Sequence, residues 1–210
     1  YNPETGAWSS LGSGVSGLGN RVSALALLQG EILVGGSFEN VGDSYASNIA
    51  RCNLNTNQWS AVGAGTQGPV LSFAVLPDGN IIVGGGFSSA GGLQTGTLAK
   101  YNPATNLWAV LGSSPIGPVY SMAVLPEGDV VVGGDFNYVA GITANNVALY
   151  NTSSDSWSTL GVGAGVVGGD DGPRAGRGDG EELGLTPGGD PLLPPGESAT
   201  QGKTTRPPRR

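Results

Sequence analysis

A unit of 49 residues repeats along most of this 210-residue chain. Four tryptophans mark it most clearly, with two intervals of 49 residues preceded by one of 51; they are Trp8, Trp59, Trp108 and Trp157. A glycine pair, followed two residues later by phenylalanine, recurs at the same interval: Gly35-Gly36 with Phe38, Gly84-Gly85 with Phe87, and Gly133-Gly134 with Phe136. A period of this size predicts a stack of equivalent supersecondary units.

Each unit contains the residue pattern of four short strands. In the second complete unit, a β-rich run over 70–76 leads into Asp78-Gly79, a dipeptide that favours a two-residue hairpin. The apolar run 81–83 is typical of a strand covered on both faces. A loop at 87–92, a third strand over 97–101, a turn at 102–106 and a fourth strand over 107–111 complete the unit. The pattern therefore predicts one antiparallel four-stranded sheet per repeat.

The sequence divides into a repeat region, residues 1–161, and a tail, residues 162–210. We expect sheets over 22–62, 70–111 and 119–160, preceded by a lone strand over 8–11. The tail contains no Phe, Tyr or Trp and half of the chain's 14 prolines. We expect it to be a disordered Gly/Pro-rich segment, because it buries too little apolar surface to offset its ordering entropy.

Four strands every 40–50 residues are typical of the blades of a β-propeller. The double glycine that ends the second strand, Tyr101 and Tyr150 on the third strand and the tryptophan on the fourth resemble the kelch-type blade, although Cys52 replaces the tyrosine in the first complete unit. The motifs at 83–87, 101–102 and 111–112 are similar to the Gly-rich kelch-like repeats of fungal cortical cell-polarity proteins and of bacterial secreted or surface proteins. The resemblance covers residues 1–161.

This resemblance implies a kelch-like propeller segment of three full blades and one strand, within a larger surface or cell-cortex protein. It favours an extracellular or cell-surface location. Propellers close with about four to eight blades. We therefore expect either further blades outside this segment or self-association.

The repeated tryptophans and tyrosines have two interpretations. Because they occupy the same position in every unit, we expect them to pack between neighbouring blades; an aromatic sugar-binding platform is the alternative. Gly84-Gly85-Gly86 lacks the Lys-Ser/Thr of a phosphate loop, so we interpret the glycines as allowing a bulge or a close backbone approach. Cys52 is expected to be a small core residue.

The remaining motifs carry little chemistry. Asp78, Glu127, Asp129 and Asp135 supply too few converging oxygens for calcium and are interpreted as parts of solvated turns. We expect no metal and no cofactor. Asn151-Thr152-Ser153 is the only N-glycosylation sequon, so Asn151 is a possible glycosylation site. The integrin-recognised tripeptide Arg177-Gly178-Asp179 is interpreted as a chance occurrence.

Charge and histidine content exclude several classes of function. The net charge is −7, and residues 1–161 contain three basic against nine acidic residues, which argues against a nucleic-acid partner. No apolar run approaches the roughly 18–20 residues of a membrane helix. The chain has no histidine, which excludes Ser-His-Asp catalysis, His-ligated zinc and the copper site of the galactose oxidase family, another user of kelch-type propellers.

A non-catalytic scaffold that mediates protein–protein interaction therefore fits the sequence better than an enzyme. A carbohydrate-binding propeller of a secreted protein is the alternative, and a galactose-oxidase-like fragment is disfavoured. Recognition is expected in the loops that vary between units, since variable loops on a rigid frame carry most binding sites. These loops span 39–48, 88–96 and 137–146 within units, and 12–21, 63–69 and 112–118 between units.

Overall fold

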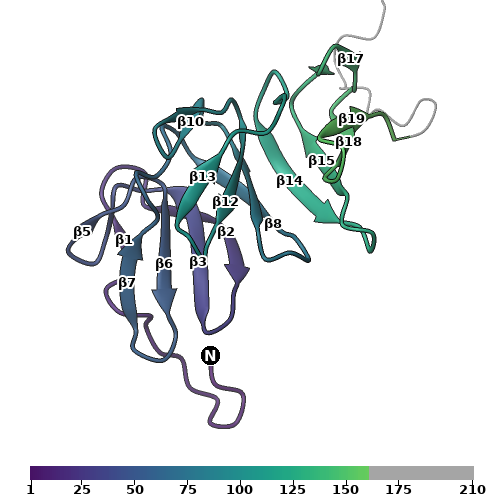
Figure 1. Ribbon diagram of the computed structural model, residues 1–210. Helices are drawn as coiled ribbons and strands as arrows, with labels where there is room; N and C mark the ends of the chain where they lie inside the picture. The colour runs from purple at the N-terminus through teal and green to yellow at the C-terminus, as the bar shows by residue number, and fades with distance from the viewer. Residues whose placement is uncertain (161–210) are drawn as a thin grey trace, which may run out of the picture. The chain divides into compact units, whose positions relative to one another are not determined.

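The computed structural model describes residues 1–160, and all the regular secondary structure in that range is β-strand (Figure 1). Three antiparallel four-stranded sheets follow one another along the chain. The first blade contains β2 (Arg21–Leu27), β3 (Glu31–Ser37), β6 (Ile49–Asn53) and β7 (Gln58–Ala61). The second blade contains β8 (Val70–Val75), β9 (Ile81–Gly85), β12 (Leu98–Asn102) and β13 (Leu107–Ala109). The third blade contains β14 (Val119–Val124), β15 (Val130–Gly134), β18 (Val147–Asn151) and β19 (Ser156–Ser158). The predicted all-β fold class of four-stranded antiparallel blades is confirmed. The expected tail at 162–210 lies outside the described residues.

The segments after each phenylalanine are short hairpins rather than plain loops. They are β4 (Asn40–Val41) with β5 (Ser44–Tyr45), β10 (Ser89–Ala90) with β11 (Leu93–Gln94), and β16 (Tyr138–Val139) with β17 (Ile142–Thr143). β1 (Val15–Ser16) pairs with β4. Phe38, Phe87 and Phe136 are buried under these hairpins, in clusters that contain Val41, Ala90 and Val139 respectively. Each phenylalanine thus anchors the hairpin that follows it.

The second glycine of each pair lies opposite a β-bulge. The register between the first two strands of a blade shifts at Val22/Ala24, Val70/Ser72 and Val119/Ser121. The bulge brings the partner strand's carbonyl close: a Cβ placed on Gly85 would lie 2.1 Å from the carbonyl oxygen of Pro69, and one on Gly134 would lie 2.2 Å from that of Pro118. Only glycine fits opposite such a bulge.

The first glycine of the pair makes room for the next blade. A Cβ on Gly35 would lie 2.4 Å from Cγ1 of Val70, and one on Gly84 would lie 2.8 Å from Cγ1 of Val119. Both valines are fully buried. Complete burial of a valine side chain contributes about 1.5–3 kcal/mol, so this contact between a valine and a glycine is a substantial part of each blade–blade interface.

The tryptophan of each fourth strand lies against the connecting segment that enters its own blade. The indole Nε1 of Trp59 donates a hydrogen bond to the carbonyl of Leu11, and that of Trp157 donates to the carbonyl of Ser113, both at 3.0 Å. The Trp108 ring lies against Gly63 and packs on a core cluster that contains Leu33 of the preceding blade. The half-buried rings of Trp108 and Trp157 therefore join neighbouring blades, whereas Trp59 ties the first blade to the segment that precedes it.

The tyrosines of the third strand support these tryptophans. The ring centroids of Tyr101 and Trp108 are 5.0 Å apart, and so are those of Tyr150 and Trp157, both in tilted geometry that aromatic rings favour. Cys52 occupies the tyrosine position in the first blade and is fully buried.

The structure corrects the sequence-based expectations at two further places. No strand forms over Trp8 to Leu11, and Trp8 is 83% exposed, in contact with Tyr1 instead of a core. In each blade the fourth strand pairs only with the third strand of that blade. Residues 8–11 have no such partner, because the described residues before Trp8 contain only a turn. The first hairpin of the second blade is also longer than expected: the Leu76 amide bonds to the carbonyl of Asn80, which encloses three residues and places Gly79 at φ 82°.

Replacing Trp108 with alanine should destabilise the protein by about 3 kcal/mol, the lower end of the range for a truncated core aromatic. The indole is only half-buried but contacts Tyr101, Gly63 and Gly91. Urea denaturation followed by far-UV circular dichroism measures the change. Trp8→Ala is the matched control, and we expect it to leave stability nearly unchanged; an equal loss in both variants would contradict this packing.

The three consecutive glycines of the second blade should respond differently to alanine. Gly84→Ala and Gly85→Ala should each cost about 1–3 kcal/mol or more, because the new methyl meets Val119 in one case and the Pro69 carbonyl in the other. Gly86→Ala should be close to neutral, since its Cβ would be 3.5 Å from the nearest atom, an ordinary contact. Thermal melts of the three variants make the comparison, and a similar loss for all three would refute the assigned roles.

Candidate functional site

The two sets of variable loops meet at one end of the blades. Antiparallel strands place the connection from second to third strand and the connection between blades at the same edge. The structure pairs them directly: Val15 of the first connecting segment pairs with Val41, Thr66 forms a bridge with Ala90, and the Ile116 amide donates to the carbonyl of Tyr138 at 3.1 Å. We call this surface, formed by residues 12–20, 38–48, 63–69, 87–97, 112–118 and 136–146, the hairpin face.

Hydrogen bonds between blades hold the hairpin face together. The Ser47 hydroxyl and the Asn48 side-chain amide, from the first blade, both donate to the carbonyl of Thr66 at 2.8 Å. Between the second blade and the segment that leads to the third, the Ser114 hydroxyl donates to the Thr95 carbonyl at 2.6 Å, and the Thr97 hydroxyl donates to the Pro115 carbonyl at 3.1 Å. Loops tied to neighbouring blades in this way present their exposed side chains in fixed positions.

Apolar and aromatic side chains are exposed on the hairpin face. They are Leu18 at 78%, Tyr45 at 69%, Leu93 at 39%, Ile116 at 77% and Tyr138 at 53% exposure. The charged residues in or next to these segments are three acids and one base, namely Glu39, Asp43, Asp135 and Arg21. The surface is therefore apolar and weakly acidic.

The opposite end carries the turns and a groove between the first two blades. Leu27, Val75, Pro77 and Pro103 provide apolar lining, and Glu31 lies among them. Glu31 pairs with Arg51 at 3.8 Å. Glu31 and Asp78 both line the groove beside these apolar residues, a mixed lining that is compatible with a small polar ligand.

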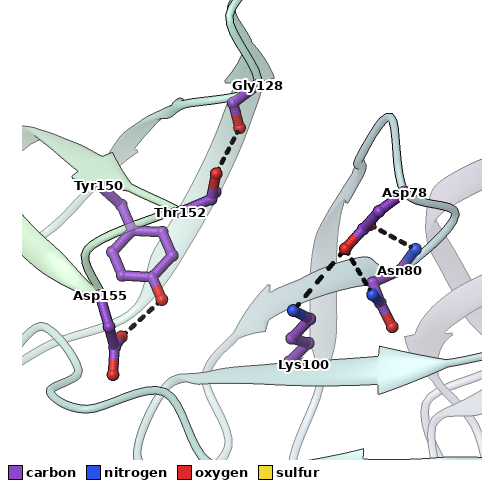
Figure 2. A network of polar contacts seen from close by, with 7 residues as sticks. All are labelled: Asp78, Asn80, Lys100, Gly128, Tyr150, Thr152 and Asp155. Atoms are coloured by element: carbon purple, nitrogen blue, oxygen red, sulfur yellow. Dashed lines mark hydrogen bonds and ion pairs between the residues drawn. The ribbon is translucent and has the colours of Figure 1, made fainter.

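A second ion pair lies beside this groove (Figure 2). Asp78 faces Lys100 at 3.9 Å and accepts two hydrogen bonds from Asn80. Partial burial raises the pKa of the Asp78 carboxyl, but the Asn80 hydrogen bonds and the Lys100 charge outweigh burial and leave that pKa below its ordinary value. Asp78 is thus an ionised turn residue.

The third blade closes its turns with side-chain hydrogen bonds. The Thr152 hydroxyl donates to the Gly128 carbonyl at 3.1 Å, and the Tyr150 hydroxyl donates to a carboxylate oxygen of Asp155 at 2.6 Å (Figure 2). Burial, with the hydrogen bond to Asp155 and its charge, raises the pKa of the Tyr150 phenol well above its ordinary value. These contacts fix the turn and leave Tyr150 in its neutral form.

The side chain of Asn151, the sequon asparagine, is held in a turn by hydrogen bonds. Its side-chain oxygen accepts hydrogen bonds from the amides of Ser153 and Ser154, and its Nδ2 donates to Asp129 at 3.0 Å. Equivalent asparagines at 2, 53 and 102 accept the same kind of bond in the other units. A glycan on Nδ2 would have to displace the Asp129 contact, so this geometry disfavours modification of the folded protein.

The acids considered as calcium ligands do not cluster. Asp129 bonds to Asn151 and Thr152, and Asp78 bonds to Asn80. Within residues 1–160, no group of three or more His, Cys, Asp or Glu side chains could hold a metal ion. The tripeptide at 177–179 lies outside the described residues.

Cys52 shows no sign of reactivity. Its side chain is fully buried, and burial together with the negative charge of Glu31 raises the pKa of its thiol. A raised thiol pKa disfavours the nucleophilic thiolate.

Sequence reasoning located the variable loops but missed what joins them. Val15 pairs with Val41 in a two-residue ladder, and Thr66 pairs with Ala90 in a single isolated bridge. Both are too short for a period-2 pattern to show. The exposed rings of Tyr45 and Tyr138 were missed because they are not periodic. Their place in the variable segment that follows each buried phenylalanine is the one signal that could have found them.

Comparison with known proteins supports the β-propeller fold. Residues 74–168 match the family described as the Rax2 C-terminal beta propeller domain, and residues 30–55 match a beta-propeller domain of unknown function, DUF5122. Among solved structures, "Structure of YjhT" is similar with a TM-score of 0.47 and 19% identity over 72% of this chain; the chain spans 53% of that structure's length. No curated protein matches the sequence. Neither the kelch type nor a particular subfamily follows from these matches.

The residues that the structure describes include no helix long and apolar enough to cross a membrane.

Stability should fall above about pH 10, and Tyr150 should contribute to the fall. An unfolded tyrosine ionises near pH 10, whereas the folded protein holds the Tyr150 proton more tightly. This contribution is fully present below about pH 10 and is lost as the pH rises beyond it. Urea midpoints measured from pH 8 to 11.5 should decline more steeply for the wild-type protein than for Tyr150→Phe; parallel curves would contradict the raised pKa.

Proposed function

We propose that this propeller segment is a non-catalytic scaffold whose hairpin face binds another protein. The observation that carries the proposal is the exposure of Tyr45, Ile116 and Tyr138 on loops that hydrogen bonds and buried phenylalanines hold in place. Exposed aromatic residues on a rigid frame resemble the anchors that dominate protein–protein interfaces. Preorganised loops also lose little conformational entropy on binding.

The charge of the hairpin face supports a protein partner over a nucleic acid. One base against three acids gives no site for phosphate contacts. The surface of the partner protein that fits the hairpin face would have apolar pockets for the two tyrosine rings and few acidic groups. Such a surface is common among proteins.

The engagement of the acidic side chains supports a non-catalytic role. Asp129 holds the turn at Asn151, Asp155 holds Tyr150, and Asp78 pairs with Lys100. Each of these carboxylates has a structural task. Asp78 shares a groove with Glu31, but each of the two is paired with a base, Lys100 or Arg51.

Binding should depend on the two exposed tyrosines of the hairpin face. The full-length protein is immobilised, exposed to extract from its source organism, and the retained proteins are quantified by mass spectrometry. A partner should bind the wild type and be reduced at least about tenfold by Tyr45→Ser/Tyr138→Ser, because loss of an interface anchor typically costs more than 1 kcal/mol.

The matched control is Leu54→Ser/Leu107→Ser, which removes exposed apolar side chains near the opposite end. This double variant should retain the partner. Equal retention by the hairpin-face variant, or loss with the control variant alone, would show that the partner binds elsewhere.

Carbohydrate binding is the second candidate, and the exposed rings of Tyr45 and Tyr138 favour it. A sugar ring can stack on an exposed aromatic face. A glycan array probed with the wild type and the double tyrosine variant separates the two candidates: a signal that requires both rings indicates a glycan, and its absence together with a retained protein supports the scaffold.

A further inference from the structure

The groove at the turn end lies between two blades that the structure describes. The first blade contributes Leu28 and Glu31 to its walls, and the second contributes Val75, Asp78 and Pro103. We call it the turn groove. Its volume of about 620 Å³ lies within the range of about 300–1,000 Å³ that is typical of ligand sites. The groove thus forms where neighbouring blades meet, and not at an end of the described segment.

The third blade shows how its two turns at this end can be joined. The Thr152 hydroxyl donates a hydrogen bond to the Gly128 carbonyl at 3.1 Å (Figure 2). The Thr152 amide and the Asn151 side chain both donate to Asp129, at 3.2 and 3.0 Å. These three bonds connect the turn between the first two strands of that blade to the turn between its last two strands.

The second blade lacks the groups that make these bonds. Pro103 occupies the repeat position of Thr152 and has neither a hydroxyl nor an N–H to donate. Asn80 occupies the position of Asp129, and its side-chain amide donates to Asp78 at 2.6 Å (Figure 2). Within the described residues, the two turns of the second blade are therefore not joined in this way, and both line the turn groove.

The glycine of the first turn also has different surroundings in the two blades. A Cβ on Gly128 of the third blade would lie 3.7 Å from Pro77 of the preceding blade, an ordinary contact distance. A Cβ on Gly79, at the same repeat position of the second blade, would have no atom within 4 Å. Gly79 lines the turn groove, so this open space is part of it.

The charged residues in the lining of the turn groove are acidic. They are Glu31 and Asp78, whereas their basic partners Arg51 and Lys100 are not among the lining residues. The two ion pairs measure 3.8 and 3.9 Å, which is beyond hydrogen-bond distance. Glu31 is paired through Oε2 alone, and its side chain is 30% exposed. Within residues 1–160 this carboxylate accepts no hydrogen bond, so it can receive one from a cationic donor.

We propose that the turn groove binds an extended peptide segment of a partner protein, in which a lysine or arginine lies between apolar residues. The basic side chain pairs with Glu31, and its apolar neighbours pack on Leu28, Val75 and Pro103. Charge complementarity sets the register of the peptide, because an uncharged or acidic side chain opposite Glu31 would bury that carboxylate without a donor.

The shape of the turn groove favours a peptide over a small cation. Its walls are turns, and Pro77, Asp78 and Gly79, which line it, are exposed to solvent. Sites for small molecules typically bury about 70–90% of the ligand surface, whereas a groove with exposed walls lets a chain continue beyond it. The turn groove lies at the opposite end of the blades from the hairpin face, and this proposal does not depend on a partner at that face.

Selection of peptides on the full chain tests the proposal. Random peptides displayed on phage are selected against the immobilised protein, and the enriched ones are synthesised with a fluorescent label. We expect a group of enriched peptides with a lysine or arginine between apolar residues. Their Kd, measured by fluorescence anisotropy, should rise at least about tenfold with Glu31→Gln, because the charge-assisted bond is lost. It should rise similarly with Ala104→Trp, which fills the groove at an exposed lining position and leaves its charges in place.

Glu127→Gln is the matched control for the loss of charge. Glu127 is exposed on the equivalent turn of the third blade and does not line the groove, so this variant should leave the Kd unchanged. The hairpin-face variant Tyr45→Ser/Tyr138→Ser should also bind these peptides as the wild type does. Circular dichroism checks that each variant is folded; if Glu31→Gln or Ala104→Trp is not, the other one decides.

Four results would overturn the proposal. The selection would yield no group of basic peptides, or the peptides would bind the Glu31→Gln and Ala104→Trp variants as tightly as the wild type. An equal loss with Glu127→Gln would indicate unspecific charge attraction, and a loss with the hairpin-face variant alone would place the peptides on the hairpin face. Displacement of a peptide by an equal concentration of arginine amide would show that the groove recognises the cation without the peptide.

Discussion

The seating of a valine over a glycine between consecutive blades is the contact on which the arrangement depends. It joins Val70 to Gly35 and Val119 to Gly84, in each case 35 residues apart. The same glycine pair opposes the bulge inside its own blade, so a single dipeptide sets both the curvature within a sheet and the approach of the next one. The spacing from the second glycine of each pair to the tryptophan of the same blade is constant at 23 residues, whereas the extra residues of the first tryptophan interval lie between Trp8 and Val22.

Much of this architecture could be predicted from sequence because its determinants are periodic. The glycine pairs and the tryptophan of the fourth strand recur in register, and they were expected to mark a strand end and a packed ring. The phenylalanine recurs with them, but its role as an anchor for the following hairpin was not predicted. The turns at 102–106 and 151–155 follow from asparagine side chains that bond to nearby amides. Trp8 shows the limit of the approach: its period matches, but a strand needs a neighbouring strand, and residues 1–7 supply none.

The candidate site was less predictable, for a physical reason. Exposed side chains such as Tyr45, Leu93 and Tyr138 have no packing partner that would impose a period on them. Pairing of the connecting segments with the hairpins depends on few hydrogen bonds, such as the two that flank the Thr66–Ala90 bridge and the one from Ile116 to Tyr138. The loops that vary could be found from the sequence, but their assembly into one surface could not.

Some surfaces of each blade are occupied by packing or by turns, and the remaining ones are where a partner can bind. Sheet faces are needed for blade packing, and at the turn end the side chains of Asn53, Asn102 and Asn151 are occupied by the turns themselves. The hairpin face differs because its phenylalanine anchors lie beneath the surface and leave the exposed positions free to differ from blade to blade. Tyr45, Leu93 and Tyr138, exposed at different places in their hairpins, show that freedom. A binding surface on this scaffold can therefore change without disturbing the contacts that hold the blades together.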